Sequence, residues 1–219
     1  MTLPCLILRR AKARGFAQLL ILLIALCAAK TWAQSPVVLV LGDSISAGYG
    51  MKLKDGWVQL LAERLQTSHP KWSVVNASIS GETTAGGLRR LPALITSHQP
   101  QTVIIELGGN DGLRGYPISQ LRSNLAQLIQ LSAAAGAEVL VSSMEIPPNF
   151  GSRYTALFRE SFEAAAEGTR ATVIPFILSG VATTPALMQA DGIHPTEAAQ
   201  PMILDSIWPY VTAALDRAQ

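Results

Sequence analysis

Apolar runs and amphipathic segments alternate along the chain from Val37 to the C-terminus. Continuously apolar runs are typical of strands buried on both faces, and apolar spacing of i, i+3, i+4 and i+7 is typical of a helix with one buried face. In residues 118–134, Leu121, Leu125 and Leu128 follow the helical spacing. The pattern predicts strands at 37–41, 73–75, 103–107, 139–142 and 172–175, and helices at 55–67, 86–97, 118–134, 153–167 and 196–216.

Strands and helices in strict alternation predict a parallel sheet covered on both sides by helices. No internal repeat, linker or low-complexity stretch interrupts residues 34–219. A segment of that length can bury a sufficient core as one unit. We therefore expect a single three-layer α/β/α domain over 34–219.

Residues 1–33 have the composition of a targeting signal rather than of a folded segment. Arg9, Arg10, Lys12 and Arg14 precede an apolar stretch at 16–29, and Thr31-Trp32-Ala33 then supplies small residues at the −3 and −1 positions of a cleavage site. This order is typical of a secretory signal peptide, and the apolar part is short for a membrane span. We expect a cleaved signal and a periplasmic or secreted protein, with an uncleaved anchor as the alternative.

Removal of this segment changes the charge and the cysteine count. It carries five basic residues and no acids, so the formal net charge falls from +2 to −3. Cys5 and Cys27 are the two cysteines of the chain, and both lie in the segment. The remaining chain has no basic patch that would favour nucleic acid, and its stability has to come from a core rather than from disulfides.

Four polar blocks lie where such a sheet would bring them together. Three follow predicted strands and the fourth precedes the last helix: Gly42-Asp43-Ser44, Asn76 to Gly81, Gly108-Gly109-Asn110-Asp111 and Asp191-Gly192-Ile193-His194-Pro195. Ligands of open α/β sheets bind beyond the carboxyl ends of the strands. Chance could supply any one block, but four on one rim predict a functional site.

The first and last blocks supply the parts of a catalytic triad. Ser44 is the candidate nucleophile, at what we expect to be a strand-to-helix junction with helix N–H groups nearby. His194 is the candidate base, because it has a carboxylate, Asp191, three residues earlier that can orient its imidazole. His69 and His98 each end a predicted helix before a nearby proline, which is an ordinary structural role.

The middle blocks supply candidate oxyanion donors. Asn110 has a side-chain amide that donates, and Gly81 allows a backbone N–H to approach a ligand closely. The N–H of Ser44 would be the third donor. Each block by itself could equally be a turn or a helix cap.

Two rival kinds of chemistry have weaker support. Residues 77–81, Ala-Ser-Ile-Ser-Gly, loosely imitate the Gly-x-Ser-x-Gly elbow of α/β-hydrolases, which would make Ser80 the nucleophile, but the first glycine is missing. No clustered His/Cys spacing or phosphate-binding glycine loop occurs. We expect no metal site.

Taken together, the four blocks resemble those of the GDSL, or SGNH, hydrolase family, named for its Ser, Gly, Asn and His. The resemblance extends over 36–216, and residues 75–81 and 106–115 look most like its branch of periplasmic acyl-CoA thioesterases, lysophospholipases and arylesterases. It implies a flavodoxin-like sheet of order 2-1-3-4-5 and no cofactor. It also implies that Ser44 attacks, that His194 and Asp191 assist, and that Ser44, Gly81 and Asn110 form the oxyanion hole.

The resemblance further implies a small-molecule acyl ester or thioester, including lysophospholipid, as substrate. The acyl group would lie beside the segment after the third strand, and a second wall could follow the fourth strand. The candidate substrate-binding residues are Leu113, Arg114, Tyr116, Ile146 and Pro147. The alternatives are a carbohydrate O-acetyl esterase and a non-catalytic lipid-binding protein. We expect a monomer with no stable membrane insertion after signal cleavage.

Overall fold

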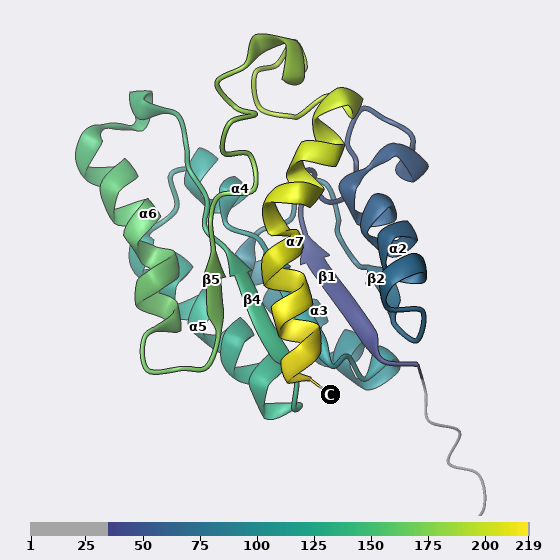
Figure 1. Cartoon of the computed structure of the whole chain (residues 1–219). Helices are drawn as coiled ribbons and strands as arrows, with labels where there is room; N and C mark the ends of the chain where they lie inside the picture. The colour runs from purple at the N-terminus through teal and green to yellow at the C-terminus, as the bar shows by residue number, and fades with distance from the viewer. Residues whose placement is uncertain (1–34, 219) are drawn as a thin grey trace, which may run out of the picture. The chain divides into compact units, whose positions relative to one another are not determined.

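Five parallel strands form one sheet in the order β2-β1-β3-β4-β5 (Figure 1). The computed structural model describes residues 35–218, so the predicted signal peptide lies outside the described residues. The strands are β1 (Val37–Gly42), β2 (Ser73–Asn76), β3 (Thr102–Glu106), β4 (Glu138–Ser142) and β5 (Thr172–Ile174). The register pairs Val40 with Ile104 and Gly42 with Glu106, so β1 and β3 end side by side.

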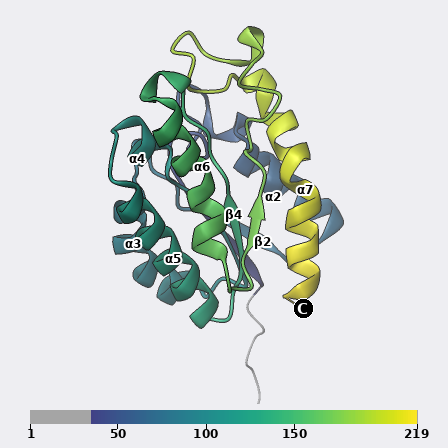
Figure 2. The ribbon, with the colours of Figure 1, turned by 90° about the vertical axis from the view of Figure 1, so that its left-hand side faces the viewer.

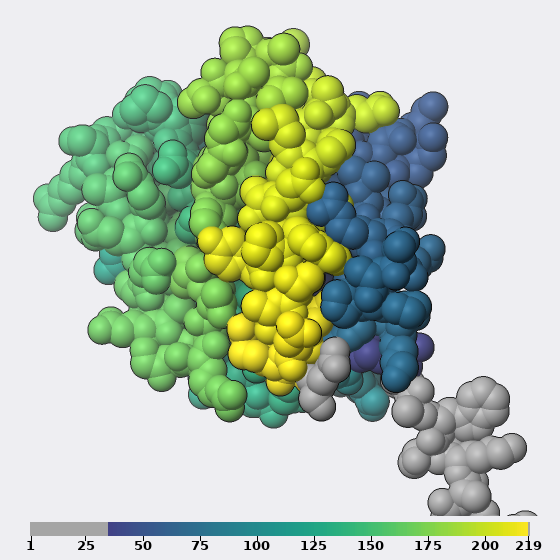
Figure 3. Space-filling model, viewed as in Figure 1, coloured from purple at the N-terminus to yellow at the C-terminus, as the bar shows by residue number. Residues whose placement is uncertain are grey.

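The helices cover both faces of the sheet, which makes three layers. Figure 2 shows α3, α5 and α6 on one face and α2 and α7 on the other. The α-helices are α2 (Trp57–Ser68), α3 (Thr84–His98), α4 (Gly109–Leu113), α5 (Ile118–Ala134), α6 (Ser152–Ala166) and α7 (Gln200–Arg217), and the 3₁₀ turns are η1 (Leu53–Asp55), η2 (Pro148–Phe150), η3 (Pro185–Leu187) and η4 (Glu197–Ala199). In Figure 3, α7 crosses one face between α2 and the segment that contains β5.

Alternate residues of the central strands point to opposite faces, so the sheet separates two apolar cores. Val38 and Val40 of β1 pack with α2 and α7, whereas Leu39 and Leu41 pack with α3, α5 and α6. All four side chains are fully buried. This double burial explains why the strand sequences are continuously apolar.

The predicted fold class and sheet order are confirmed, and the ends of the predicted helices lie within four residues of the observed ones. One local expectation was wrong: Ser44 does not lie at the start of a helix. Residues 44–50 form consecutive turns, and the following helix begins only at Trp57. A helix N-terminus therefore does not supply N–H groups to Ser44. The short helix α4 was also missed, because Gly108-Gly109 resembles a turn in sequence.

Within residues 35–218, no helix is long and apolar enough to cross a membrane.

Candidate active site

Ser44, His194 and Asp191 form a hydrogen-bonded line at the carboxyl end of the sheet. The Nε2 atom of His194 lies 2.8 Å from Ser44 Oγ, and Nδ1 lies 2.7 Å from Asp191 Oδ2. The three residues come from the turn after β1 and from the loop before α7. Residues that are 150 positions apart in sequence thus meet in the geometry of a nucleophile, a base and an orienting carboxylate.

The Asp191 carboxylate holds the loop that carries both Asp191 and His194. Asp191 Oδ1 accepts hydrogen bonds from the backbone N–H groups of Ile193 (2.9 Å) and His194 (3.0 Å). The hydrogen bond from the His194 side chain, together with these backbone donors, lowers the pKa of Asp191 from 3.8 to about 2. Asp191 is therefore ionised at neutral pH and fixes the tautomer of His194 in which Nδ1 carries the proton.

The backbone N–H groups of Ser44 and Gly81, two of the predicted oxyanion donors, have no acceptor within residues 35–218. Gly81 has a φ of +79°, which other residues rarely adopt. Its carbonyl accepts a hydrogen bond of 3.1 Å from Arg114 Nη2, which ties the Gly81 turn to the end of α4.

Asn110 is oriented by a carboxylate that the sequence analysis left without a role. Its Nδ2 donates to Asp43 Oδ2 at 3.1 Å, which leaves the second N–H of the amide for another acceptor. Asp43 Oδ1 in turn accepts from the N–H of Ile45, beside the candidate nucleophile. Asp43, only 3% exposed, thus links the Ser44 turn to the Asn110 helix.

A second buried carboxyl group, Glu106, lies behind Asp43. Its Oε2 accepts from the hydroxyl of Ser46 and from the N–H of Asp43, whereas Oε1 has no partner among the described residues. Burial, reinforced by the charge of Asp43, raises the pKa of Glu106 well above 4.5. Burial also raises the pKa of Asp43 from 3.8 to about 6. The sequence signal that could have identified Glu106 is a single acidic residue in an otherwise apolar strand.

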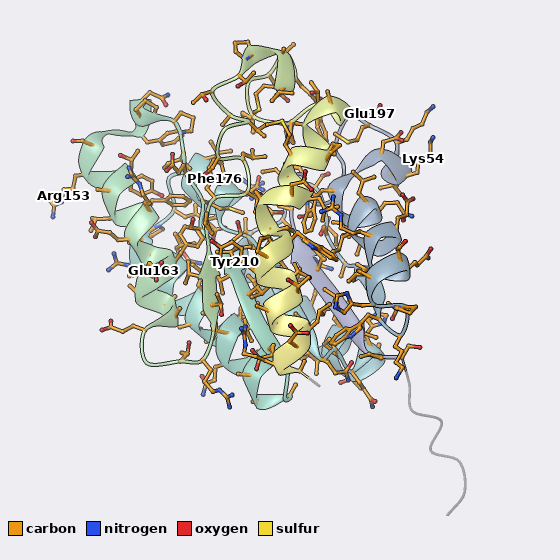
Figure 4. The ribbon with its side chains drawn as sticks, in the orientation of Figure 1. Lys54, Arg153, Glu163, Phe176, Glu197 and Tyr210 are labelled. Atoms are coloured by element: carbon orange, nitrogen blue, oxygen red, sulfur yellow. The ribbon has the colours of Figure 1, made fainter. Side chains whose placement is uncertain are left out.

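A cavity of about 480 Å³ opens beside Ser44 and His194 and extends toward the ends of β4 and β5. Of the predicted substrate-binding residues, Leu113, Ile146 and Pro147 line it. Further apolar walls, which sequence reasoning did not identify, come from Met144, Phe176, Leu178, Ala182, Met188 and Ile193. Phe176, labelled in Figure 4, is half-buried and packs against both apolar cores.

Arg114 and Tyr116 do not line this cavity. Arg114 donates to the Gly81 carbonyl, and the carbonyl of Tyr116 accepts a 2.7 Å hydrogen bond from the hydroxyl of Tyr154. Both residues therefore make contacts within the fold at the rim of the site. The rival nucleophile Ser80 is exposed and makes no hydrogen bond to a histidine of the described chain.

The fold and this geometry define a hydrolase of the esterase class. The chain belongs to the GDSL-like lipase/acylhydrolase family, whose model matches residues 40–200. It is 50% identical over 177 residues to esterase TesA of Pseudomonas aeruginosa, which covers 81% of this chain and 88% of that protein.

Two further proteins support the same assignment. Over 173 residues the chain is 46% identical to thioesterase 1/protease 1/lysophospholipase L1 of Escherichia coli K12, covering 79% of this chain and 82% of that protein. The crystal structure of the psychrotrophic esterase EstA from a Pseudoalteromonas species, inhibited by monoethylphosphonate, has a TM-score of 0.79 and 42% identity. That comparison covers 82% of this chain and 98% of EstA. The predicted family is thereby confirmed.

The raised pKa of Asp43 predicts a pH dependence of stability. Because its pKa in the folded state lies above its unfolded value of 3.8, the native protein binds the proton more tightly between about pH 4 and pH 6. The free energy of unfolding should therefore fall as the pH rises through this window. In Asp43→Asn this titration is removed, and the fall between pH 4 and pH 6 should be smaller by about 1 to 3 kcal/mol.

Urea unfolding of both proteins at pH 4, 5 and 6 measures this difference. The same pH dependence in wild type and Asp43→Asn would contradict it.

Proposed function

We propose that the chain is a serine esterase that hydrolyses carboxylic ester and thioester bonds of acyl substrates through an acyl-enzyme on Ser44. The observation that carries the proposal is the Asp191–His194–Ser44 line, with contacts of 2.7 and 2.8 Å. In the first step Ser44 Oγ attacks the acyl carbonyl carbon while His194 Nε2 takes its proton. Asp191 stabilises the imidazolium that forms, and it stays ionised because its pKa is about 2.

The negative charge that develops on the carbonyl oxygen would meet three donors. These are the N–H groups of Ser44 and Gly81 and the second amide N–H of Asn110. The proposal is supported by the absence of other partners for the two backbone groups within residues 35–218. Asp43 holds the Asn110 amide in place before substrate arrives, so the donors need not reorganise.

Collapse of the first intermediate transfers the proton from His194 to the leaving alcohol or thiol and leaves the acyl group on Ser44. A water molecule, deprotonated by His194, then attacks the acyl carbon. The same donors stabilise the second oxyanion. The products are the carboxylic acid and the free enzyme, and no step calls for a metal or cofactor.

The cavity supports medium or long acyl chains as substrates. Its walls are mostly apolar, and its volume lies within the usual range for sites that bind small molecules. The names of the relatives, esterase TesA and thioesterase 1/lysophospholipase L1, point to esters, thioesters and lysophospholipids. A carbohydrate O-acetyl esterase would use the same triad but would leave most of the cavity without a role.

We further propose that residues 1–33 are a cleaved signal peptide, that the enzyme is periplasmic or secreted, and that it is a monomer. The basic, apolar and small-residue order of that segment supports export.

Ser44→Ala should lower kcat/KM for p-nitrophenyl butyrate at least about 10³-fold, because the acyl-enzyme cannot form. Ser80→Ala, four residues after the end of β2, is the matched control and should retain wild-type activity. The rate of p-nitrophenolate release by each purified mature protein shows which serine is the nucleophile. Wild-type activity in Ser44→Ala would refute both the mechanism and the assignment of the nucleophile.

Chain-length dependence distinguishes the lipid substrate from the acetyl substrate. Each methylene buried in the cavity contributes up to about 0.8 kcal/mol, so kcat/KM for p-nitrophenyl esters should rise severalfold from the acetate to the hexanoate. Palmitoyl-CoA hydrolysis, followed by thiol release, extends the comparison to thioesters. A strict preference for the acetate would favour the carbohydrate O-acetyl esterase instead.

Expression of the full chain in a Gram-negative host tests the export proposal. The mature protein should be recovered from the periplasm or medium with Gln34 at its N-terminus, as read by N-terminal sequencing. Recovery of the intact chain in the membrane fraction would indicate the uncleaved anchor.

A further inference from the structure

The ring of Tyr49 lies against the candidate base. The centroids of the Tyr49 and His194 rings are 4.3 Å apart, and the ring planes are inclined by 33°. No sequence motif pointed to this contact. The tyrosine is 49% exposed, and it is absent from the residues that line the acyl cavity. Its position therefore favours a role toward His194 rather than toward the acyl chain.

The backbone of Tyr49 connects the two halves of the site. Its N–H donates to the carbonyl of Ser44 at 3.0 Å. Its own carbonyl accepts from Gln189 Nε2 at 2.8 Å, and the same Nε2 lies 3.0 Å from the carbonyl of Pro195. The N–H of Gln189 donates to the His194 carbonyl at 2.8 Å. Tyr49 is thus fixed to the nucleophile turn on one side and to the base loop on the other.

Two physical effects follow from this placement. The ring of Tyr49 limits rotation of the His194 imidazole. Among residues 35–218, no other aromatic ring packs against that imidazole. When His194 takes the proton of Ser44, the imidazolium faces the electron-rich ring, which is a cation–π contact. Asp191 acts along the plane of the imidazole, whereas Tyr49 acts on its face.

We propose that Tyr49 is a positioning residue of this site: its ring holds the imidazole of His194 in line with Ser44 and stabilises the imidazolium that forms during each proton transfer. The proposal rests on the proposed function, since it assumes that His194 is the base. The chemical feature involved is the ring face, so phenylalanine should replace tyrosine and leucine should not.

The experiment compares Tyr49→Leu with Tyr49→Phe in the mature protein. With p-nitrophenyl butyrate, Tyr49→Leu should lower kcat about three- to tenfold and change KM less than twofold, the size expected for losing a half-exposed cation–π contact and some orientation. Tyr49→Phe should stay within about twofold of wild type. Tyr210→Leu, on α7 and outside the residues that line the cavity, is the control of the same residue type and should keep wild-type kcat.

A second measurement does not involve the acyl cavity. Covalent inactivation by a small p-nitrophenyl phosphonate also needs His194 to take the Ser44 proton, so Tyr49→Leu should slow inactivation by the same factor as kcat. Because the side chain is half exposed, the thermal midpoint of Tyr49→Leu should stay close to that of wild type, which separates the effect from unfolding.

Three results would overturn the proposal. They are wild-type kcat and inactivation in Tyr49→Leu, an equal loss in Tyr49→Phe, and a rise in KM alone, which would make Tyr49 a substrate contact. Ser44→Ala, measured in parallel, tests the proposed function separately: wild-type activity there refutes that function, whereas the Tyr49 ratios decide only the stacking role.

Discussion

The parallel pairing of β1 with β3 fixes the relative positions of the groups on which the site depends. Its register sets Gly42 beside Glu106, so the turn that carries Ser44 and the helix that carries Asn110 begin next to each other. A slip of one residue would reverse the faces of the strand and break both apolar cores at once. The same burial that stabilises the sheet therefore also holds the Ser44 turn against the Asn110 helix, and little freedom remains between these two segments.

The buried carboxyl groups of Asp43 and Glu106 fix the contacts between the Ser44 turn and the Asn110 helix, at a cost in folding stability. Asp43 accepts from Ile45 and Asn110, and Glu106 accepts from Ser46 and from the backbone of Asp43. Desolvation of such groups is unfavourable, as the raised pKa values of both show. The packing around these groups is close: a Cβ on Gly42 would approach Ser46 Cβ to 2.7 Å and Glu106 Oε2 to 2.8 Å. The chain retains two carboxyl groups where an apolar cluster could have filled the space. This is consistent with a role in orienting Asn110, directly for Asp43 and through Asp43 for Glu106.

The sequence predicted the sheet, its covering helices and the family, because each depends on patterns that local spacing reveals. The meeting of Ser44, Asp191 and His194 could also be predicted, since parallel strands bring their carboxyl ends to one edge. Glu106 was missed because one acid in an apolar run scarcely changes the strand pattern. The helix α4 was missed because Gly108, just before the helix, and Gly109, its first residue, resemble a turn in sequence. The helix forms through packing: the φ of +127° at Gly108 brings that residue against Phe162 and Leu121. Contacts such as Tyr49 with His194 depend on tertiary placement, which no local pattern encodes.

The absence of a helix start at Ser44 changes how the proposed oxyanion site has to work. In a site built on a helix N-terminus, several aligned N–H groups and the helix dipole favour negative charge together. Here the donors would be two isolated backbone N–H groups on turns and one side-chain amide, from three different segments. Each segment is fixed separately, with Gly81 held by Arg114, Asn110 by Asp43, and the Ser44 turn by Glu106 through Ser46. Stabilisation of an oxyanion by such a set depends on preorganisation rather than on a large field. Buried and rim polar contacts that touch no substrate therefore become part of what the chemistry requires.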